Sequence, residues 1–435
     1  MIFRLATIGA VSALLGLAAL AQTPTVESTQ GRSRVVVVTD NTPVKPTSTA
    51  TKPILESEPR LSPTPERAAG PTQAPVATQP LSSVPRPLLE TAAAPRVDMS
   101  FIEIKSKIAD AKRQLQTRPE ATAMTDSPAG HNWVKIAFLD PKTEKIDFVT
   151  ITKTSFLVTG QVTTAISEGG RTVTQRTIRA NGVNTPVQIF DITGQPLLPL
   201  MVQYPVERGG RYYETAYYMS THPGLVTSDV VAAGKLYVRN VIEIARDRLR
   251  AKGISISPKI ADRAERLATV EHVDHQRFRT EPHQVIYDDI FTLYALNEGQ
   301  TYRYSVSSAG AGGMVQMIPS TYSMVRSWHP NVGLMPDFVE GMRNHVNAAQ
   351  AMLLYMNRTW NDLVASPTIS AALASGIATP EQLMAAGYNS NPARLAGYIS
   401  RGGANWTSLI PRETQIYLQI YSSLERFVPM SPRTR

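Results

Sequence analysis

The chain has 435 residues, no cysteine and a formal net charge of +9 at pH 7, and its length is sufficient for two or three domains with a sizeable core. The absence of cysteine excludes disulfides, thiolate metal sites, a cysteine nucleophile and a lipoprotein anchor. The positive charge favours anionic partners such as cell-wall polymers or membrane surfaces, and without a nucleic-acid-binding motif we expect no nucleic-acid partner.

Residues 1–21 have the pattern of a secretory signal peptide. Arg4 precedes an apolar run that begins at Leu5, and Ala19, Leu20 and Ala21 form a small-x-small cleavage site. We therefore expect a periplasmic or otherwise exported protein after cleavage. The alternative is an uncleaved anchor helix, because the run is nearly long enough to span a bilayer.

Residues 22–97 are rich in proline, threonine, serine and alanine. Proline removes backbone donors, and few large apolar residues remain to offset the entropy of ordering, so we expect a disordered linker. The four valines at 35–38 either add as a strand to a partner or have no structural role.

Residues 98–130 are expected to form an amphipathic helix and a connector. Apolar residues recur there with helical spacing, at Phe101, Ile104, Ile108, Ala111 and Leu115.

Residues 131–226 change to short β-favouring runs separated by turn signals. The runs include residues 148–151, 156–158 and 187–190, and glycine pairs or proline stand between them. This pattern predicts a small antiparallel sandwich or barrel. Four tyrosines near its end either pack in the core or stack on a sugar or a partner: Tyr212, Tyr213, Tyr217 and Tyr218.

Residues 227–284 read as a helical lead-in, with helices over 228–251 and 258–277 and Ser257 as an N-cap. A further helix is expected over 344–363. The histidines His272, His275 and His283 lack the spacing of a zinc site, so we interpret them as structural and expect no metal or cofactor.

The segment 297–321 reads NEGQTYRYSVSSAGAGGMVQMIPST and carries the candidate chemistry. Glu298 follows the apolar run 290–296, and a carboxyl group that is partly removed from water can donate a proton near neutrality. Glycines at 310, 312 and 313 allow close backbone approach, which could bring Gln316 beside Glu298. The alternative is a solvated glutamate at a helix end, followed by an ordinary glycine-rich loop.

The segment resembles the soluble lytic transglycosylase family, which is related to goose-type lysozyme. That family has a catalytic Glu, then a Ser, then a Gly-Ala-x-Gly-x-x-Gln block ending in Pro-x-Thr. The matching positions here are Glu298, Ser307, Gly310, Ala311, Gly313, Gln316, Pro319 and Thr321. Two more family blocks follow in order, at residues 387–395 and 412–417. Gly299 departs from the family, which usually has Ser directly after its Glu.

The resemblance covers residues 285–425 and leaves 426–435 as a tail. It implies a mainly α, lysozyme-like C-terminal domain and says nothing about the residues before it. With the β-favouring runs and the proline-rich segment described above, we expect an α+β multidomain chain, in which this domain follows a small antiparallel β domain and a disordered Pro-rich tether. The resemblance also implies that Glu298 acts alone, first as acid and then as base, while the 6-hydroxyl of the sugar closes a 1,6-anhydro ring. Asp288 and Asp289 do not have the spacing of a second catalytic carboxylate.

By the same resemblance, four side chains line the cleft as substrate-binding residues: Ser307, Gln316, Tyr388 and Asn389. For each of them helix packing or loop capping is the alternative role. Glu413 is a weaker member of this set, because a glutamate at a helix N-terminus is also explained by the helix dipole.

Three functions follow from these patterns. The first is a lytic transglycosylase that acts on peptidoglycan and opens the wall for an envelope or secretion machine. A protein of that machine would bind the tether or the β domain. The second is a non-catalytic peptidoglycan-binding component of such a machine. The third is a hydrolytic lysozyme, which differs from the first only in its product.

Overall fold

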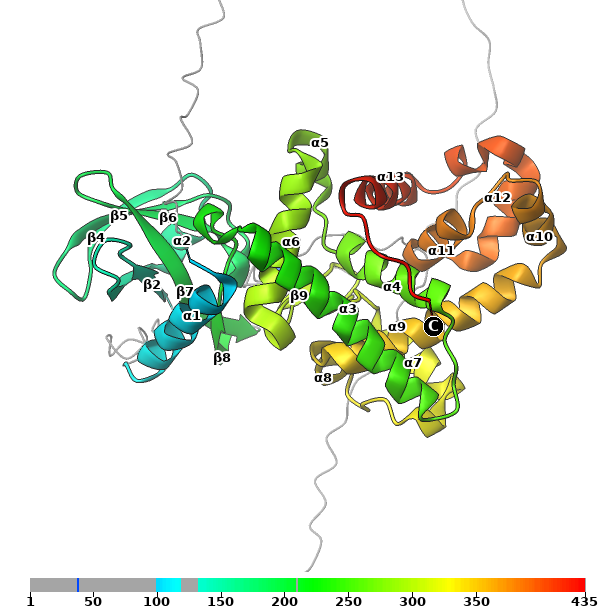
Figure 1. Ribbon diagram of the computed structural model, residues 1–435, viewed down its shortest axis with the longest axis horizontal. Coiled ribbons are helices and arrows are strands. Elements are labelled where there is room, and N and C mark those ends of the chain that lie inside the picture. Colours follow the sequence, from blue (N-terminus) through cyan, green and yellow to red (C-terminus); the bar gives the residue numbers. More distant parts are fainter. Residues whose placement is uncertain (1–36, 39–98, 119–131, 209, 435) are drawn as a thin grey trace, which may run out of the picture. The chain divides into compact units, whose positions relative to one another are not determined.

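The computed structural model describes residues 37–38, 99–118, 132–208 and 210–434. The expected signal peptide and nearly all of the expected linker lie outside these residues. In the described part the chain mixes α and β structure, with an antiparallel sheet that precedes most of the helices, which confirms the broad class (Figure 1).

Helix α1 (Phe101–Gln116) forms where the apolar spacing predicts it. The hydroxyl of Ser100 accepts a hydrogen bond from the backbone N–H of Glu103, and the Glu103 carboxylate accepts one from the backbone N–H of Ser100. This reciprocal capping satisfies backbone donors that the first turn would otherwise leave open. The buried face of α1 carries Ile104, Ile108, Ala111 and Leu115 and packs on strand β7 (Pro196–Arg208), beside which it lies in Figure 1.

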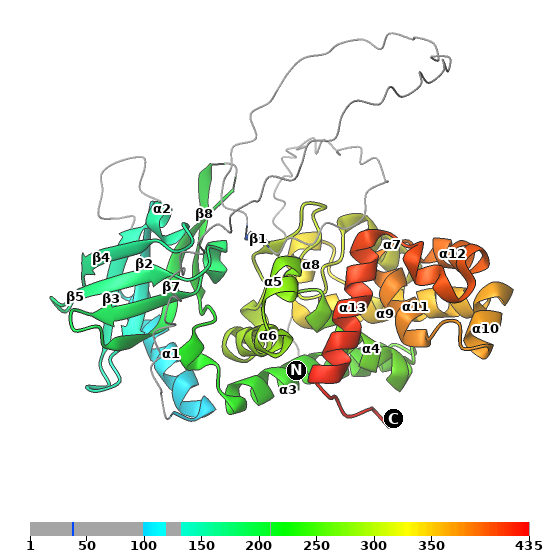
Figure 2. The ribbon, with the colours of Figure 1, turned by 90° about the horizontal axis from the view of Figure 1, so that it is seen from above.

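The β-rich region forms a seven-stranded antiparallel sheet in the order β3-β2-β7-β6-β5-β4, with β8 also paired to β7. The remaining strands are β2 (Trp133–Leu139), β3 (Ile146–Thr152), β4 (Val162–Ile166), β5 (Thr172–Thr177), β6 (Val187–Asp191) and β8 (Arg211–Tyr218). The Glu168 backbone N–H, just past β4, donates to the Phe148 carbonyl of β3 over 2.8 Å. The two ends of the sheet therefore approach each other, and the sheet curls into a near-barrel (Figure 2).

The helical part begins with α3 (Ser228–Arg250), which crosses α6 (His283–Asn297) at close range. A Cβ atom added to Gly234 on α3 would lie 1.9 Å from the carbonyl oxygen of Phe291 on α6. Only glycine permits this crossing, which brings the end of α6 to a defined place beside α3.

The predicted helix over 258–277 is wrong at its C-terminal end. Ser257 does cap α4 (Pro258–Val270), but α4 stops at Val270, and Asp274 then caps a separate short helix, α5 (His275–Thr280). The helix predicted over 344–363 is confirmed as α9 (His345–Val364), with Asn344 as its N-cap.

The other helices are α2 (Lys153–Phe156), α7 (Pro319–Trp328), α8 (Phe338–Arg343), α10 (Pro367–Ala374), α11 (Pro380–Asn389), α12 (Leu395–Gly402) and α13 (Arg412–Phe427). Helix α13, red in Figure 2, packs on α4 and α11. Among the residues that the structure describes, no helix combines the length and apolar character needed to cross a membrane.

Candidate functional site

Glu298 stands directly after α6, at the start of the 3-10 turn η4 (Glu298–Gln300). Its backbone N–H still bonds to the carbonyl of Tyr294, but its φ of 47° and ψ of −124° lie in a region that residues with a side chain rarely adopt. Such a conformation costs free energy and persists only where the surroundings hold it in place. This strain makes the turn at Glu298 a candidate functional position.

Several hydrogen bonds hold the backbone around Glu298. The Thr301 N–H donates to the Glu298 carbonyl over 2.9 Å, and the Thr301 hydroxyl donates to the carbonyl of Leu293 over 2.9 Å. The side chain of Asn297 bonds to both backbone groups of Met219, at 2.9 and 2.7 Å. The turn is thereby fastened both to α6 and to the chain just beyond β8.

The carboxylate of Glu298 forms an ion pair with the Nζ atom of Lys105 on α1, and 51% of the Glu298 side chain is exposed. The expectation of a desolvated carboxyl at the end of an apolar helix is therefore wrong for this arrangement. The helix itself is buried, but the chain turns outward at Glu298, and a cation meets the carboxylate there. A neighbouring cation stabilises the charged form of a carboxyl group, not the acid.

Ser307 and Gly313 belong to a tight turn that follows strand β9 (Ser305–Val306). The Ser307 hydroxyl accepts a hydrogen bond from the Ala311 N–H over 3.0 Å, so this side chain braces the glycine-rich turn. A Cβ atom added to Gly313 would lie 2.3 Å from the Met342 carbonyl oxygen. The close backbone approach predicted from the glycines is confirmed at Gly313.

Gln316 is buried, and its side-chain amide donates to the Gly313 carbonyl over 2.9 Å. The amide nitrogen is thus used within its own turn, and no bond from it to Glu298 is present among the described residues. The backbone of Gln316 also has a positive φ, of 45°. Three non-glycine positions of the segment 297–321 therefore have a positive φ, which residues with a side chain rarely adopt: Glu298, Tyr302 and Gln316.

Tyr388 and Asn389 come from the end of α11 and reach the motif. The Tyr388 hydroxyl donates to the carbonyl of Val315, next to Gln316, over 2.7 Å. The Nδ2 atom of Asn389 is buried and has no hydrogen-bond partner among the described residues. Since buried polar groups are nearly always paired, an unpartnered amide donor at this place is suited to a ligand acceptor.

Glu413 lies in the first turn of α13, as the helix-dipole alternative predicts. Two other residues of the same block fasten α13 to its neighbours. The Gln415 amide donates to the carbonyls of Ser408 and Ile410, and the Tyr417 hydroxyl donates to Glu271 over 2.7 Å.

Asp288 and Asp289 both have partners on nearby residues. Asp289 pairs with Arg277 at 2.6 Å, and Asp288 accepts from the Gln284 amide at 2.7 Å. Burial raises the pKa of Asp289, and the Arg277 charge opposes that shift. These contacts are those of structural carboxylates.

The sequence interpretation missed Tyr237 and His345. The Tyr237 hydroxyl lies 2.9 Å from His345 Nδ1, and His345 Nε2 lies 2.8 Å from the carbonyl oxygen of Thr301. Burial, followed by the charge of Glu298, raises the pKa of Tyr237. Tyr237 lies within the predicted helix over 228–251, and nothing in the sequence around it indicates that its hydroxyl lies near the motif.

The motif also contacts the β-rich region. The Tyr302 N–H donates to the Tyr218 hydroxyl over 3.3 Å, and Glu214 pairs with Arg303 at 3.4 Å and with Arg343 at 3.0 Å. Of the four tyrosines considered above, Tyr218 is buried in the core, whereas Tyr212 and Tyr213 are exposed.

Strand β1 (Val37–Val38) pairs antiparallel with β9, so two of the four valines at 35–38 lie beside the motif. The pairing joins Val37 to Val306 and Val38 to Ser305. The expectation that this patch either joins another protein or has no structural role is wrong for these two residues, which form a strand within their own chain.

Two of the three histidines once considered for zinc make structural contacts. His272 Nε2 donates to the Met314 carbonyl over 2.9 Å, and its ring stacks on Tyr302 with centroids 3.4 Å apart. His283 lies within hydrogen-bonding distance of Ser423 and Phe278. Within the described ranges, no group of three His, Cys, Asp or Glu side chains could hold a metal ion.

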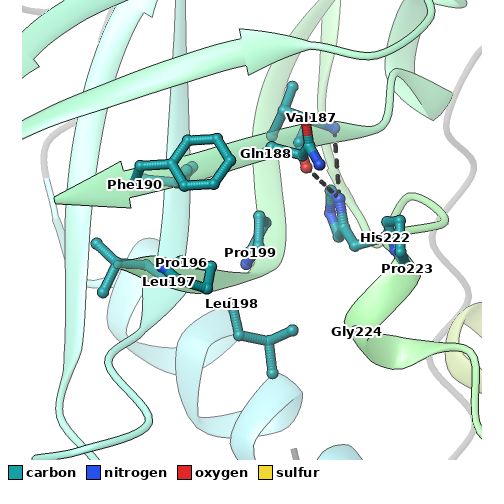
Figure 3. Close-up of a pocket in the computed structure, with 11 residues that line it drawn as sticks. Val187, Gln188, Phe190, Pro196, Leu197, Leu198, Pro199, His222, Pro223 and Gly224 are labelled. Carbon is teal, nitrogen blue, oxygen red and sulfur yellow. Dashed lines mark hydrogen bonds between the residues drawn. The ribbon is translucent and has the colours of Figure 1, made fainter. Parts of the chain in front are cut away.

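A separate apolar pocket lies in the β-rich region, between β6, β7 and the turn at His222 (Figure 3). The Nδ1 atom of His222 lies 2.9 Å from the Val187 carbonyl oxygen, and burial lowers the pKa of His222 to about 4. None of the candidate site residues lines this pocket.

Comparison of the chain with protein-family models, characterised proteins and solved structures finds no match. The site is therefore interpreted from its own geometry and from the motif spacing.

Proposed function

We propose that the chain is a peptidoglycan lytic transglycosylase, which cleaves the MurNAc–GlcNAc β-1,4 bond and forms 1,6-anhydro-MurNAc. The observation that carries this proposal is the hydrogen bond from the Tyr388 hydroxyl to the Val315 carbonyl. It joins the second sequence block to the first, as a shared active site requires. Under this proposal the helical region within residues 285–425 is a lysozyme-like catalytic domain.

In the proposed reaction Glu298 first donates its proton to the glycosidic oxygen. The resulting carboxylate then accepts the proton of the sugar's 6-hydroxyl, whose oxygen attacks the anomeric carbon and closes the anhydro ring. The hydroxyl is attached to the substrate, so its effective concentration at the anomeric carbon is high. The ion pair of Asp289 with Arg277 and the hydrogen bond of Asp288 with Gln284 agree with a mechanism that uses a single carboxylate.

The reaction requires Lys105 to leave Glu298, because its Nζ atom occupies the carboxylate that must face the glycosidic oxygen. Lys105 belongs to α1, which precedes the residues of the proposed domain. We infer that substrate binding displaces this lysine. The buried Nδ2 atom of Asn389 is then available to a substrate oxygen, such as the carbonyl of an N-acetyl group.

The proposed enzyme is exported, periplasmic, and partnered with peptidoglycan. A protein of an envelope-spanning or secretion machine is the proposed second partner, bound through the tether or the β-rich region. The net charge of +9 agrees with an anionic wall polymer as ligand.

Digestion of purified sacculi tests the proposal. The released sugars are identified by mass spectrometry, and we expect anhydro-muropeptides with little reducing-end product. A digest that contains mostly reducing-end MurNAc would identify a hydrolytic lysozyme instead.

The second candidate is a non-catalytic component that grips peptidoglycan within an envelope machine. The observation that favours it is the Lys105–Glu298 ion pair, which occupies the carboxylate that the proposed reaction needs. Binding to sacculi without release of any sugar, in the wild type and in a Lys105→Met variant alike, would support this candidate.

A further inference from the structure

The hydroxyl group of Tyr237 lies between α3, α6 and α9, close to the turn at Glu298. Its ring stacks on Tyr294 of α6, with centroids 6.1 Å apart and an interplanar angle of 25°. Its hydroxyl lies 2.9 Å from the Nδ1 atom of His345 on α9. Three helices therefore determine where this oxygen stands.

The direction of the hydrogen bond between Tyr237 and His345 follows from the other nitrogen of the imidazole. His345 Nε2 lies 2.8 Å from the carbonyl oxygen of Thr301, which can only accept, so Nε2 carries a hydrogen. Burial lowers the pKa of His345 to about 4, so the ring is neutral at pH 7 and Nδ1 has a lone pair. Tyr237 must therefore donate its hydrogen to His345.

A hydroxyl whose hydrogen is already used can only accept a further bond. The free side of the Tyr237 oxygen faces the turn after α6. A Cβ atom added to Gly299 would lie 3.9 Å from this oxygen, and apart from the adjoining residues Glu298 and Gln300 no other described residue has an atom within 4 Å of it. Because Gly299 has no side chain, the space between its backbone and the Tyr237 hydroxyl is open.

We propose that Tyr237 is a positioning residue for Glu298. After Lys105 has left, the hydroxyl oxygen of Tyr237 accepts a hydrogen bond from the protonated carboxyl group of Glu298. An acceptor favours the protonated form of a carboxyl group, whereas the Lys105 cation favours the charged form. His345 has two roles in this arrangement, since it fixes the Tyr237 hydrogen and also holds Thr301, whose N–H bonds to the Glu298 carbonyl. The proposal rests on the proposed function, because it assigns the partner of the proposed acid.

The balance of protons agrees with this role. When Glu298 gives its proton to the leaving oxygen, Tyr237 has no hydrogen to offer to the new carboxylate. That carboxylate remains basic and accepts the proton of the attacking hydroxyl. Among the described residues, the titratable side chains that pack at this place include Lys105 from α1, the ring of Tyr294 from α6 and His345 from α9.

A Tyr237→Phe variant of the full chain tests the proposal, since it removes the hydroxyl and keeps the ring. One neutral hydrogen bond contributes about 1 kcal/mol, so we expect kcat to fall about five- to ten-fold with KM unchanged. We also expect the basic limb of the pH–rate profile to move to lower pH. The matched control is Tyr287→Phe. Tyr287 is a buried tyrosine on α6, but its hydroxyl bonds to the Ile420 carbonyl.

A second measurement does not depend on activity. In a Lys105→Met background, the 13C resonance of the Glu298 carboxyl carbon is followed over pH, with and without Tyr237→Phe. We expect the pH-dependent change of this resonance to occur at lower pH in the protein with Tyr237→Phe. A change at the same pH with and without the Tyr237 hydroxyl would overturn the proposal. If sacculi give no anhydro product while the resonance still shifts, the proposed function fails and the positioning role of Tyr237 stands.

Discussion

The Nζ atom of Lys105 forms an ion pair with Oε1 of Glu298, so a side chain of α1 lies on the carboxylate that the motif marks as the acid. The two residues are 193 positions apart in the chain. Residues 39–98 and 119–131 lie outside the described structure, whereas the apolar face of α1 is buried on β7. The contact links the β-rich region and α1 to the chemistry proposed for Glu298.

Replacing Lys105 by Met is expected to raise the rate of sacculus digestion at pH 7 by up to about five-fold. A partly exposed ion pair contributes about 0–1 kcal/mol, and the variant no longer has to break this contact before the substrate reaches Glu298. The measurement is the initial rate of anhydro-muropeptide release. Lys107→Met is the control, because Lys107 lies on the same helix and pairs with Glu144. A slower Lys105→Met protein would show that the lysine assists the reaction.

Replacing Glu298 by Gln is expected to lower the rate at least about 100-fold, the scale of a removed general acid. The side chain is half exposed and the amide has the same shape, so the protein should fold normally and still bind sacculi. Product release and pull-down with sacculi are measured together. Undiminished cleavage by this variant would move the active site elsewhere in the chain.

Replacing Gly234 by Ala is expected to lower the free energy of unfolding by about 3 kcal/mol, because its Cβ atom would lie 1.9 Å from the Phe291 carbonyl oxygen. Urea unfolding measures the change. Gly397→Ala on α12 is the control, since the nearest atom there is the end of the Arg401 side chain at 3.4 Å. In a helix interior that substitution is expected to be neutral or to stabilise by up to about 1 kcal/mol. Equal stability of the two variants would mean that α3 and α6 can separate without cost.

Stability is expected to fall as the pH decreases from about 6.5 to about 4. Burial lowers the pKa values of His222 and His345 to about 4, so both stay neutral in the folded state while the unfolded chain binds protons. Because the unfolded state then holds more protons, each histidine removes about 2 kcal/mol between pH 7 and pH 5.

This pH dependence is measured by urea unfolding at both pH values. In a His222→Asn variant, the amide can still bond to the Val187 backbone. We expect the free energy of unfolding of this variant to fall less between pH 7 and pH 5 than that of the wild type. An unchanged loss in this variant would contradict the assignment of His222.

The sequence by itself determined those features that depend on neighbours along the chain. The caps at Ser257 and Asn344 begin α4 and α9 because each side chain bonds to a backbone N–H three residues away. The glycines of the motif were likewise recognisable, since a positive φ such as that of Gly313 favours glycine wherever the turn lies in the fold.

Only the tertiary structure decided which side chains surround Glu298. Tyr237 meets His345 across 108 positions, and Tyr388 meets Val315 across 73. Periodicity predicts which face of a helix is buried, but it does not specify which distant group that face meets, because this depends on how all the helices pack together. For the same reason the apolar run before Glu298 predicted burial of the carboxyl group, whereas the outward turn of the backbone exposed it to solvent and to Lys105.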